Sequence, residues 1–86
     1  MRHFASSAFW DLYQELPAEI RELADKNYAL LRKSPRHPSL HLKQIGRYWS
    51  VRVGARHRAL GIDADGDAVW FWIGTHAAYD RLLRSK

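Results

Sequence analysis

The chain has 86 residues, with 14 lysines and arginines against 9 acidic residues and a formal net charge of +5. That length leaves room for one domain, so we expect a single folded unit over residues 1–86. A hydrophobic content of 47% excludes the disordered and fibrous classes. The lack of cysteine excludes a disulfide scaffold and Cys-ligated metal sites. No apolar run has the length of a membrane span or the form of a signal peptide, so we expect a soluble, cytoplasmic protein with no membrane partner.

The first third of the chain predicts two helices. Ser6 offers an N-cap for a short helix over Ala8–Glu15. Pro17 ends that helix and suits the start of the next, which extends to Lys33. The apolar residues of the second helix recur at the spacing of one buried stripe: Ile20, Leu23, Ala24, Tyr28 and Leu31.

After this helix the apolar spacing changes to strict alternation, which predicts strands. Four strands are expected, at Leu40–Lys43, Tyr48–Val53, His57–Ile62 and Ala68–Ile73. Asp65-Gly66 predicts a tight hairpin, because both residues tolerate positive φ angles. The last of the four strands is apolar on both faces and should therefore lie inside the sheet.

Thr75 can cap a last helix that extends from His76 to about Arg84. The order of elements predicts an α+β fold. Two N-terminal helices pack on a four-stranded, mainly antiparallel sheet, and a short helix follows at the C-terminus.

The charge of the chain is unevenly distributed. Between Lys26 and Ile62 there is no acidic residue, yet nine of the 14 cations lie there. Cations spread over neighbouring strands repel one another unless an anion binds, so we predict a nucleic-acid partner. A solvated basic face is the alternative interpretation.

Two patterns resemble metal sites but do not predict one. Asp63, Asp65 and Asp67 have the spacing that opens a calcium loop, but the glycine and glutamate that such a loop needs further on are missing. His37 and His41 have helical metal-ligand spacing, but Pro38 between them opposes a helix. We expect no bound metal and no cofactor.

Two arginines are the strongest candidates for holding a phosphate. Arg52 and Arg58 lie on adjacent predicted strands, and forked guanidinium donors match phosphate oxygens. Arg52 faces away from the apolar residues of its strand, and we expect Arg58 to emerge near the end of its own strand. Both could equally be ordinary surface arginines.

A histidine and a tyrosine follow at the start of the last helix. His76 can exchange protons near neutral pH, and Tyr79 lies one helical turn further on. A purely structural histidine and a core tyrosine are the alternatives. Lys43, Arg47 and Arg56 are further candidates for contacts with a nucleic-acid backbone.

Several of these segments, in this order, resemble the RelE/ParE superfamily of toxins from type II toxin–antitoxin systems. They are Pro35-x-x-Pro38-x-Leu40-x-x-Lys43, Tyr48-x-Ser50-x-Arg52, Arg58-Ala59-Leu60 and Trp72-Ile73-Gly74-Thr75-His76-x-x-Tyr79-Asp80. The resemblance implies a RelE-like fold and a complete cytoplasmic toxin. It also implies an acidic antitoxin as partner in a hetero-oligomeric complex.

The resemblance leads to two different activities. RelE-like members cleave mRNA, usually on the ribosome and without a metal, by attack of a 2′-OH on the adjacent phosphate. That branch implies that Arg52 and Arg58 hold the phosphate, that His76 acts as base or acid, and that Tyr79 stacks on or orients a base. ParE-like members instead inhibit DNA gyrase. His76 stands near the position of a family arginine, which leaves the acid and base roles open, and an inactive RNA-binding relative is a third possibility.

Overall fold

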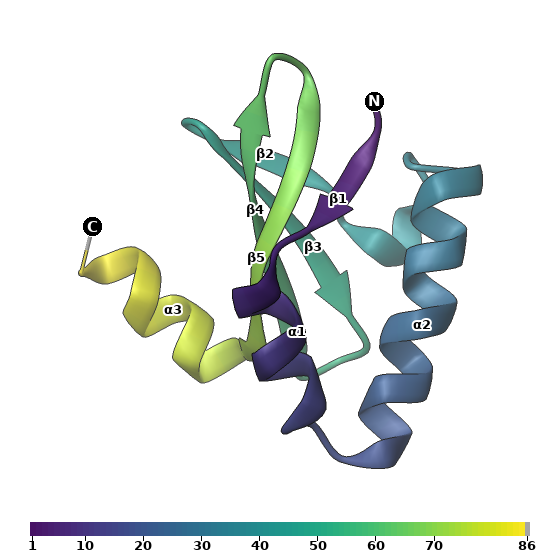
Figure 1. Cartoon of the computed structure of the whole chain (residues 1–86), viewed down its shortest axis with the longest axis vertical. Coiled ribbons are helices and arrows are strands. Elements are labelled where there is room, and N and C mark those ends of the chain that lie inside the picture. Colours follow the sequence, from purple (N-terminus) through teal and green to yellow (C-terminus); the bar gives the residue numbers. More distant parts are fainter. Residues whose placement is uncertain (86) are drawn as a thin grey trace.

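A computed structural model describes residues 1–85 of the chain. Its elements are β1 (His3–Ala5), α1 (Ser7–Gln14), α2 (Ala18–Lys33), the 3-10 helix η1 (Pro38–Leu40), β2 (Lys43–Ile45), β3 (Tyr48–Val53), β4 (His57–Ala64), β5 (Asp67–Thr75) and α3 (His76–Arg84). Figure 1 shows α3 leaving the end of β5 and projecting away from α2. Within the described residues, no helix is long and apolar enough to span a membrane.

The predicted α+β fold is confirmed, with one strand more than expected. The strands form a single sheet in the order β1-β5-β4-β3-β2. The strands β2 to β5 make an antiparallel meander, as predicted, and β1 adds to β5 in parallel. β5 therefore lies inside the sheet, between β1 and β4, as its two apolar faces suggested.

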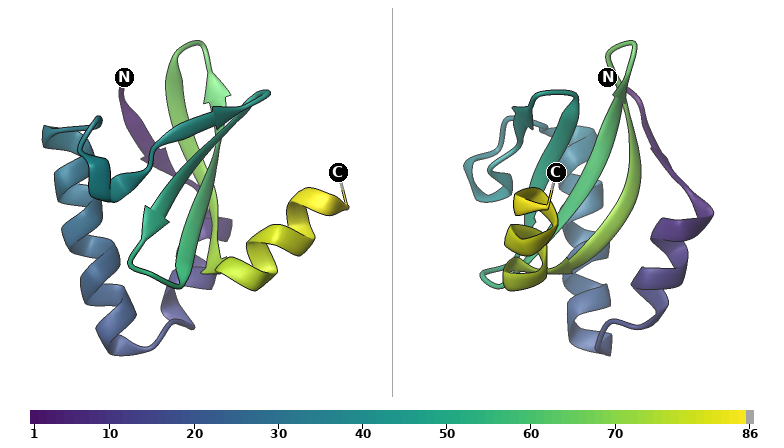
Figure 2. Two further views of the ribbon diagram at one scale, coloured as in Figure 1. Left: turned by 180° about the vertical axis from the view of Figure 1, so that it is seen from behind. Right: turned by 90° about the vertical axis from the view of Figure 1, so that its left-hand side faces the viewer.

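The two faces of the sheet have different coverings. Val51, Ala59 and Ile73 lie side by side across β3, β4 and β5 and belong to the buried core. Residues of α1 and α2 pack on that core, and Figure 2 shows α3 displaced from both helices. The next rows of the register, including Ser50 and Arg58, therefore point to the opposite face, where Tyr79 of α3 meets them.

The structure differs from the sequence prediction at two strands, β1 and β2. The strand β1 was not predicted, because three residues beside the first methionine carry too little periodicity. Leu40–Lys43 was predicted as a strand, but Pro38 begins a 3-10 turn that ends at Leu40, and His41 takes a left-handed conformation with φ of 45°. The strand β2 consequently begins only at Lys43.

A β-bulge in β5 changes which residues of that strand face the core. Leu60 pairs with Trp72 and Gly61 pairs with Trp70, so Phe71 is the extra residue. The bulge turns Trp70 and Ile73 onto the same buried face, although they are three residues apart. Gly61 makes room for the indole, because a Cβ there would lie 2.9 Å from Cε3 of Trp70.

The local signals for turns and caps are confirmed. Asp65 and Gly66 have φ angles of 55° and 91°, as a tight hairpin requires. Ser6 accepts a hydrogen bond from the Phe9 amide, and Thr75 accepts one from the Ala78 amide. These two caps fix where α1 and α3 begin, and the second sets the position of His76.

The link between β1 and β5 yields a prediction about acid stability. Asp67 accepts hydrogen bonds from the main-chain amide of Arg2 at 2.9 Å and from its guanidinium at 3.0 and 3.2 Å. The amide hydrogen bond, with the guanidinium, holds the pKa of Asp67 below its ordinary value of 3.8. A lowered carboxyl pKa stabilises the fold above the ordinary value, and that contribution is lost as the pH falls through the folded-state pKa. Asp67→Asn should therefore lower the midpoint of thermal unfolding at neutral pH and flatten its decline below about pH 4.

The matched control is Asp11→Asn, on the exposed surface of α1. It should leave the difference between the neutral and acid midpoints unchanged. Identical pH profiles for Asp67→Asn and the parent protein would contradict the assigned role of Asp67.

Candidate functional site

Arg58 lies almost completely buried beneath α3, with 5% of its surface exposed. Its Nε and Nη2 donate to the Ser50 hydroxyl at 3.0 and 2.9 Å, and Nη2 also donates to the His41 carbonyl at 3.3 Å. The Tyr79 hydroxyl lies 2.9 Å from the same Ser50 oxygen, and the guanidinium carbon lies 5.2 Å from the centre of the Tyr79 ring. The expectation that the Arg58 side chain emerges at the strand end is therefore wrong, because α3 covers it.

The guanidinium of Arg58 keeps one free edge. No carboxylate within residues 1–85 lies within 4.0 Å of it, so its charge is met by neutral oxygens and an aromatic face. Its Nη1 makes no hydrogen bond to the described residues, and no described side-chain nitrogen is both buried and unpaired. Nη1 therefore reaches solvent and can donate to an incoming anion.

Tyr79 links this buried arginine to His76. The Tyr79 ring is 3% exposed, and the His76 ring meets it edge-on with centres 5.6 Å apart. Stacking of a nucleic-acid base on Tyr79 does not fit that burial. The position of the tyrosine instead suits a supporting role for the two groups that flank it.

His76 is accessible and held by a carboxylate. Its side chain is 52% exposed, and Nδ1 lies 3.2 Å from Oδ2 of Asp80, one helical turn further along α3. A carboxylate can only accept, so this contact places the hydrogen on Nδ1 and leaves the lone pair on Nε2. The main-chain amide of His76 donates to the Arg56 carbonyl at 2.7 Å, which fastens the start of α3 to the β3–β4 turn.

Arg52 is the direct cross-strand neighbour of Arg58. It is half-buried, and its Nε donates to the Gly54 carbonyl at 2.9 Å. Two like charges opposite each other on adjacent strands are unfavourable unless an anion lies between them. Arg56 is exposed in the β3–β4 turn, at the same end of the sheet.

The other two predicted basic contacts lie apart from this end. Lys43 is exposed on the edge strand β2, directly opposite Ser50, and so shares the face of Arg58. Arg47 precedes β3 and stacks on Tyr48, at the opposite end of that strand from Arg52. The structure thus brings Arg52, Arg58, Arg56, His76 and Tyr79 to one end of the sheet. Lys43 shares the face of Arg58 but lies on β2, and Arg47 lies at the other end of β3.

The cations of the acid-free segment from Lys26 to Ile62 form no ion pair with the described carboxylates. The two ion pairs within residues 1–85 are Arg2–Asp67 and His76–Asp80, and neither involves a cation of that segment. Residues 1–85 also contain no group of three or more histidines and carboxylates placed to hold a metal ion.

Ser50 and Asp80 complete the arrangement and were not among the predicted site residues. Ser50 is fully buried and accepts from Arg58. The sequence did indicate that Ser50 shares a strand face with Tyr48 and Arg52, because these residues alternate with apolar ones. Asp80 was recognisable only by its spacing of four from His76 on a predicted helix.

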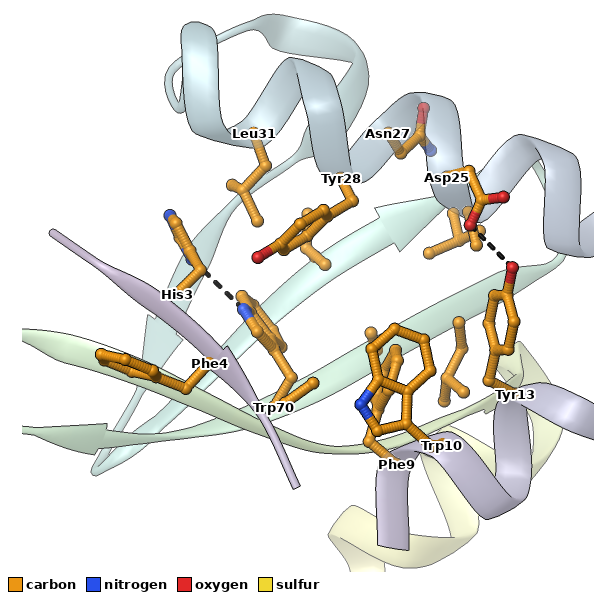
Figure 3. A pocket seen from close by; sticks show the side chains of 16 residues that line it. His3, Phe4, Phe9, Trp10, Tyr13, Asp25, Asn27, Tyr28, Leu31 and Trp70 are labelled. Atoms are coloured by element: carbon orange, nitrogen blue, oxygen red, sulfur yellow. Dashed lines mark hydrogen bonds between the residues drawn. The ribbon is translucent and has the colours of Figure 1, made fainter. Parts of the chain in front are cut away.

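A separate apolar cavity of about 190 Å³ lies on the other face, between α1, α2 and the sheet. Figure 3 shows Trp10, Tyr28 and Trp70 around it, with Tyr13 donating to Asp25 at one end. At the other end the Trp70 indole donates to His3. None of the predicted site residues lines this cavity.

Solved structures with the same architecture include several toxins. The RelB–RelE antitoxin–toxin complex from Methanococcus jannaschii has a TM-score of 0.69 and 17% identity, over 91% of this chain and 96% of that chain. The YoeB/ParE toxin from Agrobacterium tumefaciens has a TM-score of 0.65 and 20% identity, over 88% and 99%. The isolated RelE toxin from E. coli has a TM-score of 0.62 and 13% identity, over 99% and 98%. This chain has the RelE-like fold.

No protein-family model and no curated protein sequence matches the chain.

The buried Arg58 cluster yields a stability prediction. Arg58→Ala removes three hydrogen bonds and leaves an empty volume beneath α3, so we expect a loss of about 2–3 kcal/mol in the free energy of unfolding. Arg58→Met should lose less, because it refills the volume and leaves the Ser50–Tyr79 hydrogen bond in place. Urea denaturation measures both, and an Arg58→Ala protein as stable as the parent would contradict the burial of Arg58.

Proposed function

We propose that this protein is the toxin of a type II toxin–antitoxin pair and acts as a metal-independent mRNA endoribonuclease. The observation that carries the proposal is the cross-strand pair Arg52 and Arg58, neither of which forms an ion pair with a described carboxylate. His76, held by Asp80, lies at the same end of the sheet. Two cations and a proton-exchanging group at one end of a sheet suit the chemistry of a phosphodiester. The RelE-like fold and the structural similarity to known toxins support the same proposal.

The proposed reaction needs one proton removed and one charge stabilised. His76 Nε2 takes the proton of a ribose 2′-OH, because Asp80 occupies Nδ1. The 2′ oxygen attacks the adjacent phosphorus and the bond to the 5′ oxygen breaks, with solvent supplying the proton that this oxygen takes. The products are a 2′,3′-cyclic phosphate and a free 5′-OH.

The arginines have different parts in this reaction. Negative charge grows on the non-bridging phosphate oxygens as the 2′ oxygen attacks. The Nη1 edge of Arg58 is fixed in place by Ser50 on its other side, so its donor needs no reorganisation. Arg52 adds a second charge from the opposite strand, while Tyr79 positions Arg58 and His76 and does not itself react.

The proposed partners follow from charge. The cations of residues 26–62, which form no ion pair within residues 1–85, suit mRNA on the ribosome and, in the inactive complex, an acidic antitoxin. One of the structurally similar proteins is itself a toxin in complex with its antitoxin. An acidic antitoxin that covers Arg52 and His76 would block the proposed site.

Substitution of the histidine tests the proposal. His76→Ala should reduce mRNA cleavage in a translating extract about a hundredfold or more, because proton transfer by a positioned side chain contributes on that scale. Asp80→Asn should give a smaller loss, since it keeps the ring but weakens the preference for the reactive tautomer. Because His76 is half-exposed, far-UV circular dichroism should be unchanged in both variants.

The control is Arg84→Ala, at the far end of α3 and exposed. It should cleave like the parent. Full cleavage by His76→Ala would overturn the mechanism. Growth arrest by that variant with inhibition of DNA supercoiling and intact mRNA would instead indicate the gyrase-directed activity of the alternative branch.

A further inference from the structure

A basic groove of about 560 Å³ lies at the β2 edge of the sheet, apart from His76 and Tyr79. Its walls come from the loop between α2 and β2, from Lys43 and Gln44 of β2, from Trp49 of β3 and from Met1. Four of its lining residues are exposed and carry cationic or imidazole side chains: Arg36, His37, His41 and Lys43. No carboxylate lines it, and neither ion pair found within residues 1–85 involves these side chains.

The loop of this groove is held in one conformation before any ligand binds. Pro35 and Pro38 restrict its backbone. The Ser39 amide donates to Nδ1 of His37 at 3.2 Å, so the hydrogen of the neutral ring is on Nε2. His37 can therefore donate from Nε2 to a ligand oxygen without rearranging.

Trp49 supplies a fixed aromatic surface in the same groove. It is half-buried, and its indole Nε1 donates to Asp63 at 3.1 Å. A ring held this way can stack on an unpaired base at little cost in side-chain entropy. Cations around an aromatic surface suit a single nucleic-acid strand better than a duplex, whose bases are covered by stacking.

The aromatic wall of the groove lies on the core face of the sheet, where Trp49 neighbours Val51, whereas Arg58 belongs to the opposite face. Two residues at the β2 edge contact both regions. Lys43 lines the groove and lies opposite Ser50, the acceptor of Arg58. His41 lines it as well, and its carbonyl accepts from Arg58 Nη2 at 3.3 Å. His41 has a left-handed backbone with φ of 45°, an uncommon conformation for a residue other than glycine. That conformation belongs to the residue that connects the groove to the buried arginine.

We propose that this groove binds a nucleotide of single-stranded RNA outside the proposed cleavage site. Arg36, Lys43 and the Nε2 of His37 contact its phosphates, and its base stacks on Trp49. The inference rests on the proposed function for the identity of the polymer, but it adds a subsite that sets affinity and does not enter the chemistry. Loss of the groove should weaken RNA binding and raise KM, while kcat stays near that of the parent.

The test uses a short single-stranded RNA in which every 2′-hydroxyl is methylated, so that it binds but cannot be cleaved by 2′-OH attack. The groove variant is Arg36→Gln/Lys43→Gln, and the control Arg81→Gln/Arg84→Gln removes the same charge at exposed positions of α3, outside the groove and outside residues 26–62. We expect the groove variant to bind about tenfold more weakly. Its slope of log affinity against log salt should be flatter by about 1.4, since each lost phosphate contact contributes about 0.7 for single strands. The control should keep the slope of the parent.

Substitutions of Trp49 separate stacking from charge. Trp49→Phe should keep most of the affinity and Trp49→Leu should lose it, with thermal melting used to verify that both proteins fold. Equal affinity of Trp49→Leu and the parent for the methylated RNA would overturn the stacking role.

The outcomes separate this inference from the proposed function. Weaker RNA binding by the groove variant supports the groove even if no variant or parent cleaves RNA, a result that would remove the nuclease activity alone. Unchanged RNA affinity and KM in the groove variant, with cleavage still dependent on His76, would overturn the groove alone. Unchanged RNA affinity with lost binding of a poly-glutamate peptide would assign the groove to an acidic protein and also overturn the proposal.

Discussion

The burial of one guanidinium without a carboxylate is the constraint on which the arrangement of this molecule depends. A buried charge is unfavourable unless surrounding dipoles replace the water it has lost. Ser50, the His41 carbonyl and the Tyr79 ring meet that need for Arg58, and each comes from a different segment of the chain. One side chain therefore fixes the loop before β2, the middle of β3 and the position of α3 relative to the sheet.

That constraint also places the groups proposed to react. Since Tyr79 is anchored to Ser50 and Arg58, the first turn of α3 cannot shift without breaking buried hydrogen bonds. His76 lies on that turn, with its amide bonded to the Arg56 carbonyl and its ring to Asp80. A polar cluster that looks structural thus holds an exposed histidine beside two arginines, so stability and the proposed chemistry share the same contacts.

Local sequence signals predicted much of this fold. The apolar stripe of α2, the Asp65-Gly66 hairpin and the Thr75 cap each depend on residues close in sequence, where the physical rule is direct. The strand β1 depends on a parallel pairing with β5 across more than sixty residues, which no local pattern reveals. Arg52, Arg58 and His76 were predicted from residue type and alternation. The burial of Arg58 could not be predicted from the sequence, because it depends on where α3 lies and on the His41 carbonyl as acceptor.

We propose that Arg58 stays buried and still offers its Nη1 edge to a phosphate. Arginine side-chain NMR of the protein, recorded while a 2′-O-methylated RNA strand is added, tests it most directly. We expect the Nε–H signal of Arg58 to be visible in the free protein, because its hydrogen bond to Ser50 protects that hydrogen from exchange. We also expect the guanidinium signals of Arg58 and Arg52 to shift at the same midpoint of RNA concentration as the ring signals of His76. RNA binding that shifts other residues while both arginines remain unchanged would contradict it.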